Sequence, residues 1–292
     1  MSGCAISDDL LGMIPILTTP AGACLTAKNW DEVGVKTGSY HLASLLLKPG
    51  YDFMTSLPDL SAYTGWQKTV VLNASLPKPD GEGVYKLRSP YDGSYVRHTI
   101  DEILALITHL RPEMVIFPEG IMLQDPVAWK SLPDLVFPFF PLTDLPKQVE
   151  SRPYGVCLDC NKFSSSTELL RELDQYKHLP SYVTGDPGVS LMQEFMVGGV
   201  RFVESDVPAM DACLGKVYTD EGVISLGEVE YGQQFEVIDA KCQCPTCNQQ
   251  FTRAYLHHLL AQTPLLCQRF LIQHNIYFTQ AALFNEVHLR QL

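Results

Sequence analysis

The sequence has no apolar segment long enough to cross a membrane, since no stretch approaches about 20 uninterrupted apolar residues. Its first residues, MSGCAISDDLLGMIPILTT, have no basic segment and carry an early Asp-Asp pair, so we expect no signal peptide. Positive charge is also scarce: 21 Lys and Arg stand against 33 Asp and Glu, a net charge of −12. Because phosphate contacts need a basic surface, we do not expect the chain to bind nucleic acid by itself. The net charge is still compatible with a local basic patch.

A disulfide framework is also not indicated, because the nine cysteines are an odd number and three of them lie within six residues. These three, Cys242, Cys244 and Cys247, have the spacing C-x-C-x-x-C. Three thiolates this close repel one another unless a cation neutralises them, and Zn²⁺ does so with four tetrahedral sulfur and nitrogen ligands. The candidates for the fourth ligand are His257, His258 and His274. Four protein ligands leave no open position, so such a zinc is structural.

A second cysteine pair, Cys157 and Cys160, has the C-x-x-C spacing of redox and metal sites. It follows a predicted strand, but no helix begins directly behind it. We therefore favour a structural role for this pair over redox or metal chemistry.

Short apolar runs that end in polar, glycine or proline residues predict buried strands. The six runs cover residues 13–19, 69–77, 114–120, 154–160, 181–188 and 200–206. Helical patterns with polar caps and apolar stripes cover residues 98–110, 164–179 and 188–199. Alternation of strand and helix predicts an α/β fold with parallel strands. At this length a (β/α)₈ TIM-like barrel is the leading architecture, and a doubly wound sheet is the alternative.

Polar side chains stand where the predicted strands end. They are Asn73, Glu119, Asp159, Asp186 and Glu204. In a parallel barrel the functional groups lie at this edge, so the set is one candidate for an acidic pocket doing acid/base work. The other interpretation is that these residues cap loops and solvate strand ends.

The stretch CQCPTCNQQFTRAYLHHLL, followed by HNIYF, resembles the C-terminal signature of the tRNA-guanine transglycosylases, or queuine tRNA-ribosyltransferases. Weaker resemblance extends over most of the chain, in PAGACLT, SYHLASLLLKPG, RSPYDGS and GGVRFVESDVP. The resemblance implies a barrel over residues 1–225. It also implies a zinc-binding subdomain over residues 226–292, whose C-terminal helices complete the barrel. It further implies one structural Zn²⁺ per subunit, held by Cys242, Cys244, Cys247 and His274.

The same resemblance implies that the catalytic residues are degenerate. Glu204 stands where catalytic members carry a nucleophilic aspartate, and Asn73 stands where they carry a base-recognising aspartate. Leu158 replaces their base-binding glutamine. Glu119 remains at its strand end without the neighbouring acid, and no arginine for tRNA phosphate occurs near Met210. This pattern is similar to that of the non-catalytic accessory subunit of the eukaryotic enzyme.

The resemblance therefore predicts an accessory subunit that forms a heterodimer with a catalytic subunit. The heterodimer is expected to bind tRNA and to exchange guanine for queuine at the wobble position of GUN anticodons. A cytoplasmic location is expected, with peripheral association to the mitochondrial outer membrane as a further prediction. One alternative is an active transglycosylase or nucleosidase with Glu204 as nucleophile and Glu119, Asp159 or Asp186 as acid/base. Another is a diverged barrel that serves as a binding scaffold.

Overall fold

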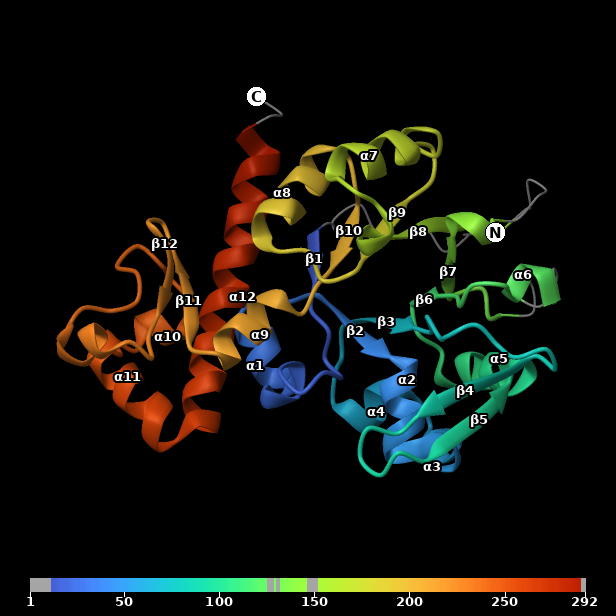
Figure 1. Ribbon diagram of the computed structural model, residues 1–292, viewed down its shortest axis with the longest axis horizontal. Helices are drawn as coiled ribbons and strands as arrows, with labels where there is room; N and C mark the ends of the chain where they lie inside the picture. Colours follow the sequence, from blue (N-terminus) through green and yellow to red (C-terminus); the bar gives the residue numbers. More distant parts are fainter. Residues whose placement is uncertain (1–11, 125–128, 130–131, 146–151, 290–292) are drawn as a thin grey trace.

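The computed structural model describes residues 12–124, 129, 132–145 and 152–289. Eight parallel strands form a nearly closed barrel (Figure 1). They are β1 (Gly12–Ile14), β2 (Thr37–His41), β3 (Thr69–Asn73), β6 (Met114–Ile116), β7 (Phe137–Pro141), β8 (Gly155–Asp159), β9 (Ser181–Thr184) and β10 (Phe202–Glu204). Their order around the sheet is β1-β10-β9-β8-β7-β6-β3-β2. The leading architecture is confirmed, and the doubly wound sheet is excluded.

The gap between the two edge strands is bridged just beyond the end of β1. The Ser39 amide donates to the Pro15 carbonyl at 2.9 Å, and the Leu17 amide donates to the Ser39 carbonyl at 2.8 Å. Ile16 and Ser39 thereby form a parallel bridge between the two edges. The strand ends are consequently held in one ring, which brings side chains from distant parts of the sequence to a common mouth.

Helices follow or precede the strands on the outside of the barrel. They are α1 (Ala27–Glu32), α2 (Leu42–Leu45), α3 (Tyr51–Ser56), α4 (Leu60–Thr64), α5 (Ile100–Leu110), α6 (Ile121–Gln124), α7 (Ser166–Asp174), α8 (Val189–Val197) and α9 (Val207–Cys213), then α10 (Pro245–Asn248), α11 (Arg253–Gln262) and α12 (Pro264–Leu289). Short helical turns are η1 (Gly22–Cys24), η2 (Leu46–Gly50), η4 (Leu142–Asp144), η5 (Cys160–Lys162) and η6 (Val229–Gln233). Two antiparallel hairpins complete the set, β4 (Val84–Arg88) with β5 (Tyr95–Thr99) and β11 (Lys216–Thr219) with β12 (Gly222–Ser225). None of the helices within the described ranges is long and apolar enough to span a membrane.

The barrel interior is a packed core, because side chains from seven of its strands meet there. The cluster consists of Ile14, Val71, Met114, Ile116, Phe137, Phe139, Cys157, Tyr182 and Phe202. A second and larger apolar layer lies between the sheet and the surrounding helices. Because the interior is filled, only the mouth of the barrel is left for a functional site.

All six predicted strands are present, and each is shorter than its apolar run. Two strands of the barrel and the four strands of the two hairpins were missed. β2 has the sequence TGSYH, and its small and polar side chains do not reveal that the strand is buried on both faces. β7 has the sequence FPFFP, where two prolines argue against a strand. Proline is tolerated in β7 because backbone pairing continues through its neighbours.

The predicted helices are also present, with shifted ends. Thr99 caps α5 by accepting from the Glu102 amide, and the Glu102 carboxylate accepts from the Thr99 amide, as the predicted cap requires. α8 ends directly before Gly198. The helix predicted over residues 164–179 is shorter, since α7 ends at Asp174 and a run of turns leads to Pro180.

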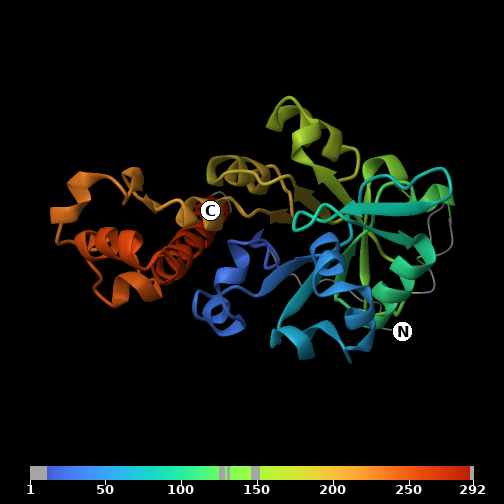
Figure 2. The same ribbon diagram turned by 60° about the horizontal axis from the view of Figure 1, so that its bottom comes forward.

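The C-terminal part of the chain protrudes from the barrel and returns to it (Figures 1 and 2). The β11–β12 hairpin, η6, α10 and α11 form the protruding part. The long helix α12 packs against α8, α9 and β1, and so takes the place of an outer helix of the barrel. The boundary between residues 225 and 226 stays a prediction. The first 11 residues, on which the signal-peptide expectation depends, lie outside the described ranges.

Tight packing at the start of β8 generates a test of the barrel. A Cβ added at Gly155 would meet the Phe139 ring at 2.4 Å and the Pro180 carbonyl oxygen at 2.7 Å. We expect Gly155→Ala to lower the free energy of unfolding by about 1–3 kcal/mol, because overpacking forces the backbone or the ring to shift. The control is Gly188→Ala, where no atom lies within 4 Å. The control should change stability by less than about 1 kcal/mol. Equal effects in urea unfolding would contradict this account.

Candidate functional site

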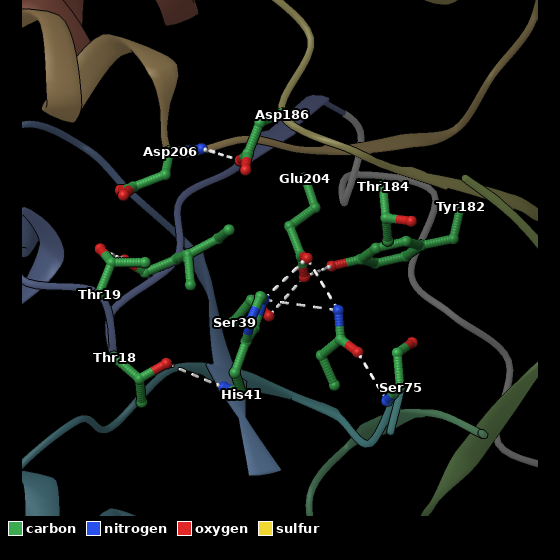
Figure 3. Close-up of polar contacts among 12 residues, drawn as sticks. Thr18, Thr19, Ser39, His41, Ser75, Tyr182, Thr184, Asp186, Glu204 and Asp206 are labelled. Carbon is green, nitrogen blue, oxygen red and sulfur yellow. Dashed lines mark hydrogen bonds and ion pairs between the residues drawn. The ribbon is translucent and has the colours of Figure 1, made fainter. Parts of the chain in front are cut away.

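Glu204 is the centre of the polar cluster at the mouth of the barrel. It is the last residue of β10 and its side chain is only 2% exposed. A buried carboxylate is costly unless hydrogen bonds satisfy both of its oxygens. The residues around Glu204 meet this requirement, and they come from three other strands (Figure 3).

Each carboxylate oxygen of Glu204 has two partners. Oε2 accepts from the Ser39 hydroxyl at 2.5 Å and from the Tyr182 hydroxyl at 2.9 Å. Oε1 accepts from the Asn73 amide nitrogen at 2.8 Å and lies 3.0 Å from Nε2 of His41. Four partners on two oxygens hold the carboxylate in one position and leave little capacity for a further contact.

The sequence identified Glu204 and Asn73 as candidates but missed Ser39, His41 and Tyr182. Ser39 and His41 are two residues apart on β2, so they project from the same side of that strand. Two polar residues at this spacing could have indicated a polar face, but only if residues 37–41 had first been predicted to form a strand. Tyr182 lies within the predicted strand over residues 181–188, where nothing distinguishes it from a core aromatic.

Glu204 and His41 form an ion pair in this cluster when His41 is protonated. Burial raises the pKa of Glu204, but the charge of His41 and hydrogen bonds from His41, Ser39 and Tyr182 outweigh it, so the pKa lies below its usual value. Burial lowers the pKa of His41, but the charge and hydrogen bond of Glu204 outweigh that effect and raise it. The pair is therefore ionised over a wider pH range than either group would be alone.

Two further acids stand beside this cluster (Figure 3). Burial raises the pKa of Asp206 to about 7, and the charges of Asp186 and Glu204 add to this. Its Oδ1 is buried and has no hydrogen-bond partner among the described residues. Asp186, whose φ is 55°, accepts a hydrogen bond from the Asp206 amide at 2.8 Å. Asp206 is thus, beside His41, a group at this mouth whose charge changes near neutral pH.

The remaining acids predicted at strand ends are engaged in local contacts. Glu119 forms an ion pair with Lys162. Asp159 caps η5 by accepting from the Asn161 amide at 3.0 Å. For these residues the loop-capping interpretation agrees with the geometry, whereas Glu204 and Asn73 belong to a buried network.

The C-x-x-C pair does not have the environment of a reactive thiol. Cys157 is buried, and burial raises its pKa strongly. Burial and the charges of Asp159 and Asp186 raise the pKa of Cys160 to about 11. A raised pKa disfavours the thiolate, which is the nucleophilic form, so the structural interpretation is favoured.

A cavity of about 610 Å³ opens beside the cluster, at the ends of β3, β6, β7, β8 and β9. Its walls include Phe117, Leu158, Phe163 and Tyr176, and the Glu119–Lys162 pair lies at its lining. Leu158 supplies an apolar wall at the position where the resemblance implies a glutamine. The cavity can take a flat apolar group, but this position offers that group no hydrogen bond.

The predicted metal ligands come together in the protruding C-terminal part. The ligand atoms of Cys242, Cys244, Cys247 and His274 lie within 4.8 Å of one another. The three sulfurs lie 3.7, 3.4 and 3.4 Å from Nδ1 of His274. A tetrahedral ion with Zn–S bonds of about 2.3 Å and a Zn–N bond of about 2.05 Å separates sulfur from nitrogen by roughly 3.5 Å. The cluster can therefore hold a metal ion.

Contacts behind the ligands orient them for a metal. Nε2 of His274 donates to the Tyr218 carbonyl oxygen at 2.7 Å, which leaves Nδ1 free to act as the ligand. Of the other candidates, His257 lies 2.7 Å from the Leu226 carbonyl through its Nδ1, outside the cluster. Among the described residues, His274 is thus the histidine placed to supply a fourth ligand, which would leave no open position on a tetrahedral ion.

The Glu204–His41 pair predicts a pH dependence of stability. Glu204 contributes stability above its unfolded pKa of about 4.3, and this is lost as the pH falls through its lower folded pKa. His41 contributes stability below its unfolded pKa of about 6.5, and this is lost as the pH rises through its higher folded pKa. The stability excess of wild type over His41→Gln should therefore be largest between about pH 4.5 and 6.5 and decline at higher pH.

Urea unfolding of wild type and His41→Gln between pH 4.5 and 9 measures this excess. The control is His178→Gln, because His178 is exposed. An excess that stays constant over this range would show that His41 acts only through packing.

The chain is similar to known proteins over most of its length. Residues 165–289 match the family of queuine tRNA-ribosyltransferases (TGT). The queuine tRNA-ribosyltransferase of Treponema denticola is 25% identical over 91% of this chain and 82% of its own length. That of Thermotoga maritima is 26% identical over 91% of this chain and 83% of its own length. That of Clostridium perfringens is 35% identical over 38% of this chain and 30% of its own length. The chain is therefore similar to queuine tRNA-ribosyltransferases over most of its length, and its residues 165–289 match their family.

Proposed function

We propose that the chain is a non-catalytic accessory subunit of a queuine tRNA-ribosyltransferase. It would pair with a catalytic subunit, and the heterodimer would exchange guanine for queuine at the wobble position of tRNAs with GUN anticodons. The observation that carries the proposal is the hydrogen bonding of Glu204, which stands where catalytic members carry a nucleophilic aspartate.

Nucleophilic attack needs a carboxylate oxygen with access to the ribose and a free lone pair. Glu204 is 2% exposed, and each of its oxygens already has two partners. Its pKa is also held below the usual value, which reflects a carboxylate stabilised in its charged ground state. To attack, the side chain would have to leave these contacts, and the bonds lost would add to the barrier.

Base recognition is also weakened around the cavity. The Asn73 amide is engaged at both ends, since its nitrogen donates to Glu204 and its oxygen accepts from the Ser75 amide at 2.9 Å. Leu158 offers no hydrogen bond to a base edge. A site built to hydrogen-bond a base loses much of its affinity and selectivity when such groups are removed. These features support the accessory role over an active transglycosylase or nucleosidase.

We expect no incorporation of labelled guanine or queuine into tRNA by the chain alone. Together with a catalytic subunit it should form a heterodimer on size-exclusion chromatography, and that complex should perform the exchange. The Glu204→Gln variant should leave the activity of the complex within about twofold of wild type, provided that the variant folds.

The matched control for this substitution is Glu194→Gln, an exposed glutamate on α8. Exchange by the isolated wild-type chain that is abolished by Glu204→Gln would replace the accessory role with the active-enzyme alternative. Failure to bind any catalytic subunit would favour the diverged scaffold.

We also propose that the metal is one structural Zn²⁺ per chain, since three thiolates and one imidazole in a closed tetrahedron suit this ion. Purified protein should contain about one equivalent of zinc. Cys244→Ser should lose the metal and destabilise the C-terminal part, because metal binding contributes folding free energy.

The control for this experiment is Cys267→Ser, since Cys267 is equally buried and lies outside the ligand cluster. It should retain about one equivalent of zinc. Folded wild-type protein that was never exposed to chelator and holds less than about a tenth of an equivalent would end the zinc proposal. The cytoplasmic location and the mitochondrial association stay predictions from the resemblance alone.

A further inference from the structure

The β4–β5 hairpin stands at the mouth of the barrel. The chain leaves the end of β3, contributes Ser75, Leu76, Pro77 and Lys78 to the wall of the cavity, and then enters β4. The hairpin forms its own two-stranded sheet, separate from the barrel. Figure 1 shows it beside α3 and α5. A ligand that covers the mouth would therefore meet this hairpin.

One face of the hairpin packs on the protein. Tyr85 lies opposite His98, and Leu87 lies opposite Val96. Tyr85 and Leu87 are buried, and the His98 ring stacks on Tyr51 of α3 with ring centroids 5.0 Å apart. This face accounts for the attachment of the hairpin to the barrel and leaves the other face to solvent.

The solvent-facing side of the hairpin concentrates positive charge. Lys86 lies directly opposite Arg97, and Arg88 lies opposite Tyr95, and all four side chains are exposed. Like charges directly opposite each other destabilise an antiparallel pair. Asp80 offsets the charge of Lys86, so the charge that this face offers to an anion is mainly that of its arginines.

The ion pairs among the described residues leave the arginines of this face without a carboxylate partner. Asp80 pairs with Lys86 at 2.7 Å, and Asp92 accepts hydrogen bonds from the amide and hydroxyl of Ser94. Within the part of the chain that the structure describes, neither Arg88 nor Arg97 forms an ion pair. In a chain with a net charge of −12, two adjacent unpaired guanidinium groups mark a site for a negatively charged partner.

Exposed aromatic rings accompany these cations. Tyr91 in the hairpin turn is 71% exposed, and Tyr95 on β5 is 60% exposed. The ammonium group of Lys48 lies 5.2 Å from the centroid of the Tyr91 ring, which places a further cation beside the turn. Flat exposed rings next to guanidinium groups are the combination that holds unpaired nucleotides, where phosphates contact the cations and bases stack on the rings.

We propose that this outer hairpin face, formed by Lys48, Lys86, Arg88, Tyr91, Tyr95 and Arg97, binds an unpaired stretch of RNA beside the barrel mouth. Arg88 and Arg97 contact phosphates, and Tyr95 stacks on a base. The choice of RNA as the polyanion rests on the proposed function in tRNA modification. An acidic protein surface would use the same cations but has no need of the two flat rings.

The test measures binding of a fluorescein-labelled anticodon stem-loop RNA by anisotropy, using both the isolated chain and its complex with a catalytic subunit. Arg88→Gln/Arg97→Gln should weaken binding about tenfold or more. It should also reduce the slope of log K against log [salt] by about 1 to 2, because two phosphate contacts are lost. The control with the same charge change is Lys36→Gln/Lys177→Gln. Lys36 and Lys177 are exposed, precede β2 and β9, and lie outside the hairpin. The control should bind as wild type does.

A second variant separates stacking from charge. Tyr95→Ala should weaken binding about tenfold with an unchanged salt slope, whereas Tyr95→Phe should bind as wild type does, because the ring is retained. Circular dichroism of each variant establishes that the hairpin variants are folded.

Unchanged RNA affinity of the folded double-arginine variant in both the chain and the complex would overturn the proposal. Loss of catalytic-subunit binding with unchanged RNA affinity would also overturn it, and would make the face a protein-docking surface. Heterodimer formation is measured separately by size-exclusion chromatography. If the hairpin variants bind RNA as wild type does but the heterodimer forms, the RNA site is wrong and the accessory role is retained. If the hairpin binds RNA but no heterodimer forms, the RNA site is retained and the accessory role is wrong.

Discussion

A carboxylate buried at the end of β10 needs four partners, and the mouth of the barrel is organised around that need. Ser39 and His41 reach Glu204 from β2, Asn73 from β3 and Tyr182 from β9. These strands surround the carboxylate because the bridge between Ile16 and Ser39 brings the two edges of the sheet together. The same contacts that make the burial tolerable occupy both oxygens of Glu204, as the proposed accessory role requires.

The metal cluster provides a second and independent constraint. Three of its ligands lie in a short segment before α11, and the fourth lies on α12. Because α12 also packs against α8, α9 and β1, an ion held at this point would link the protruding part to the barrel. The metal centre and the Glu204 network share no residue, so the chain can keep the fold of its catalytic relatives while the two sites change separately.

Charge is distributed unevenly over this acidic chain. The mouth holds Glu204, Asp186 and Asp206, and only His41 offsets them in the buried network. The hairpin beside the mouth carries unpaired arginines on its outer face. A polyanion that approaches the mouth would thus be attracted at its rim and repelled at its centre, which agrees with the proposed role of holding RNA without reacting with it.

Much of the fold was readable from the sequence because burial imposes simple patterns. Continuous apolar runs predicted six of the eight barrel strands, and the alternation with helices predicted their parallel arrangement. β2 and β7 were not predicted, since TGSYH has no apolar run and FPFFP contains two prolines. Both are strands because neighbouring strands on each side, or the closing bridge, supply their backbone partners.

The sequence by itself determined three of the four metal ligands, because C-x-C-x-x-C is a local motif whose chemistry depends on spacing. Spacing did not choose among the three histidines; the resemblance indicated His274, and the packing of α12 placed it in the cluster. Glu204 and Asn73 were visible as polar strand ends, but their contact was not, since they are 131 residues apart. Tertiary structure alone decided that Ser39, His41 and Tyr182 surround Glu204, because barrel closure sets neighbours that no local pattern encodes.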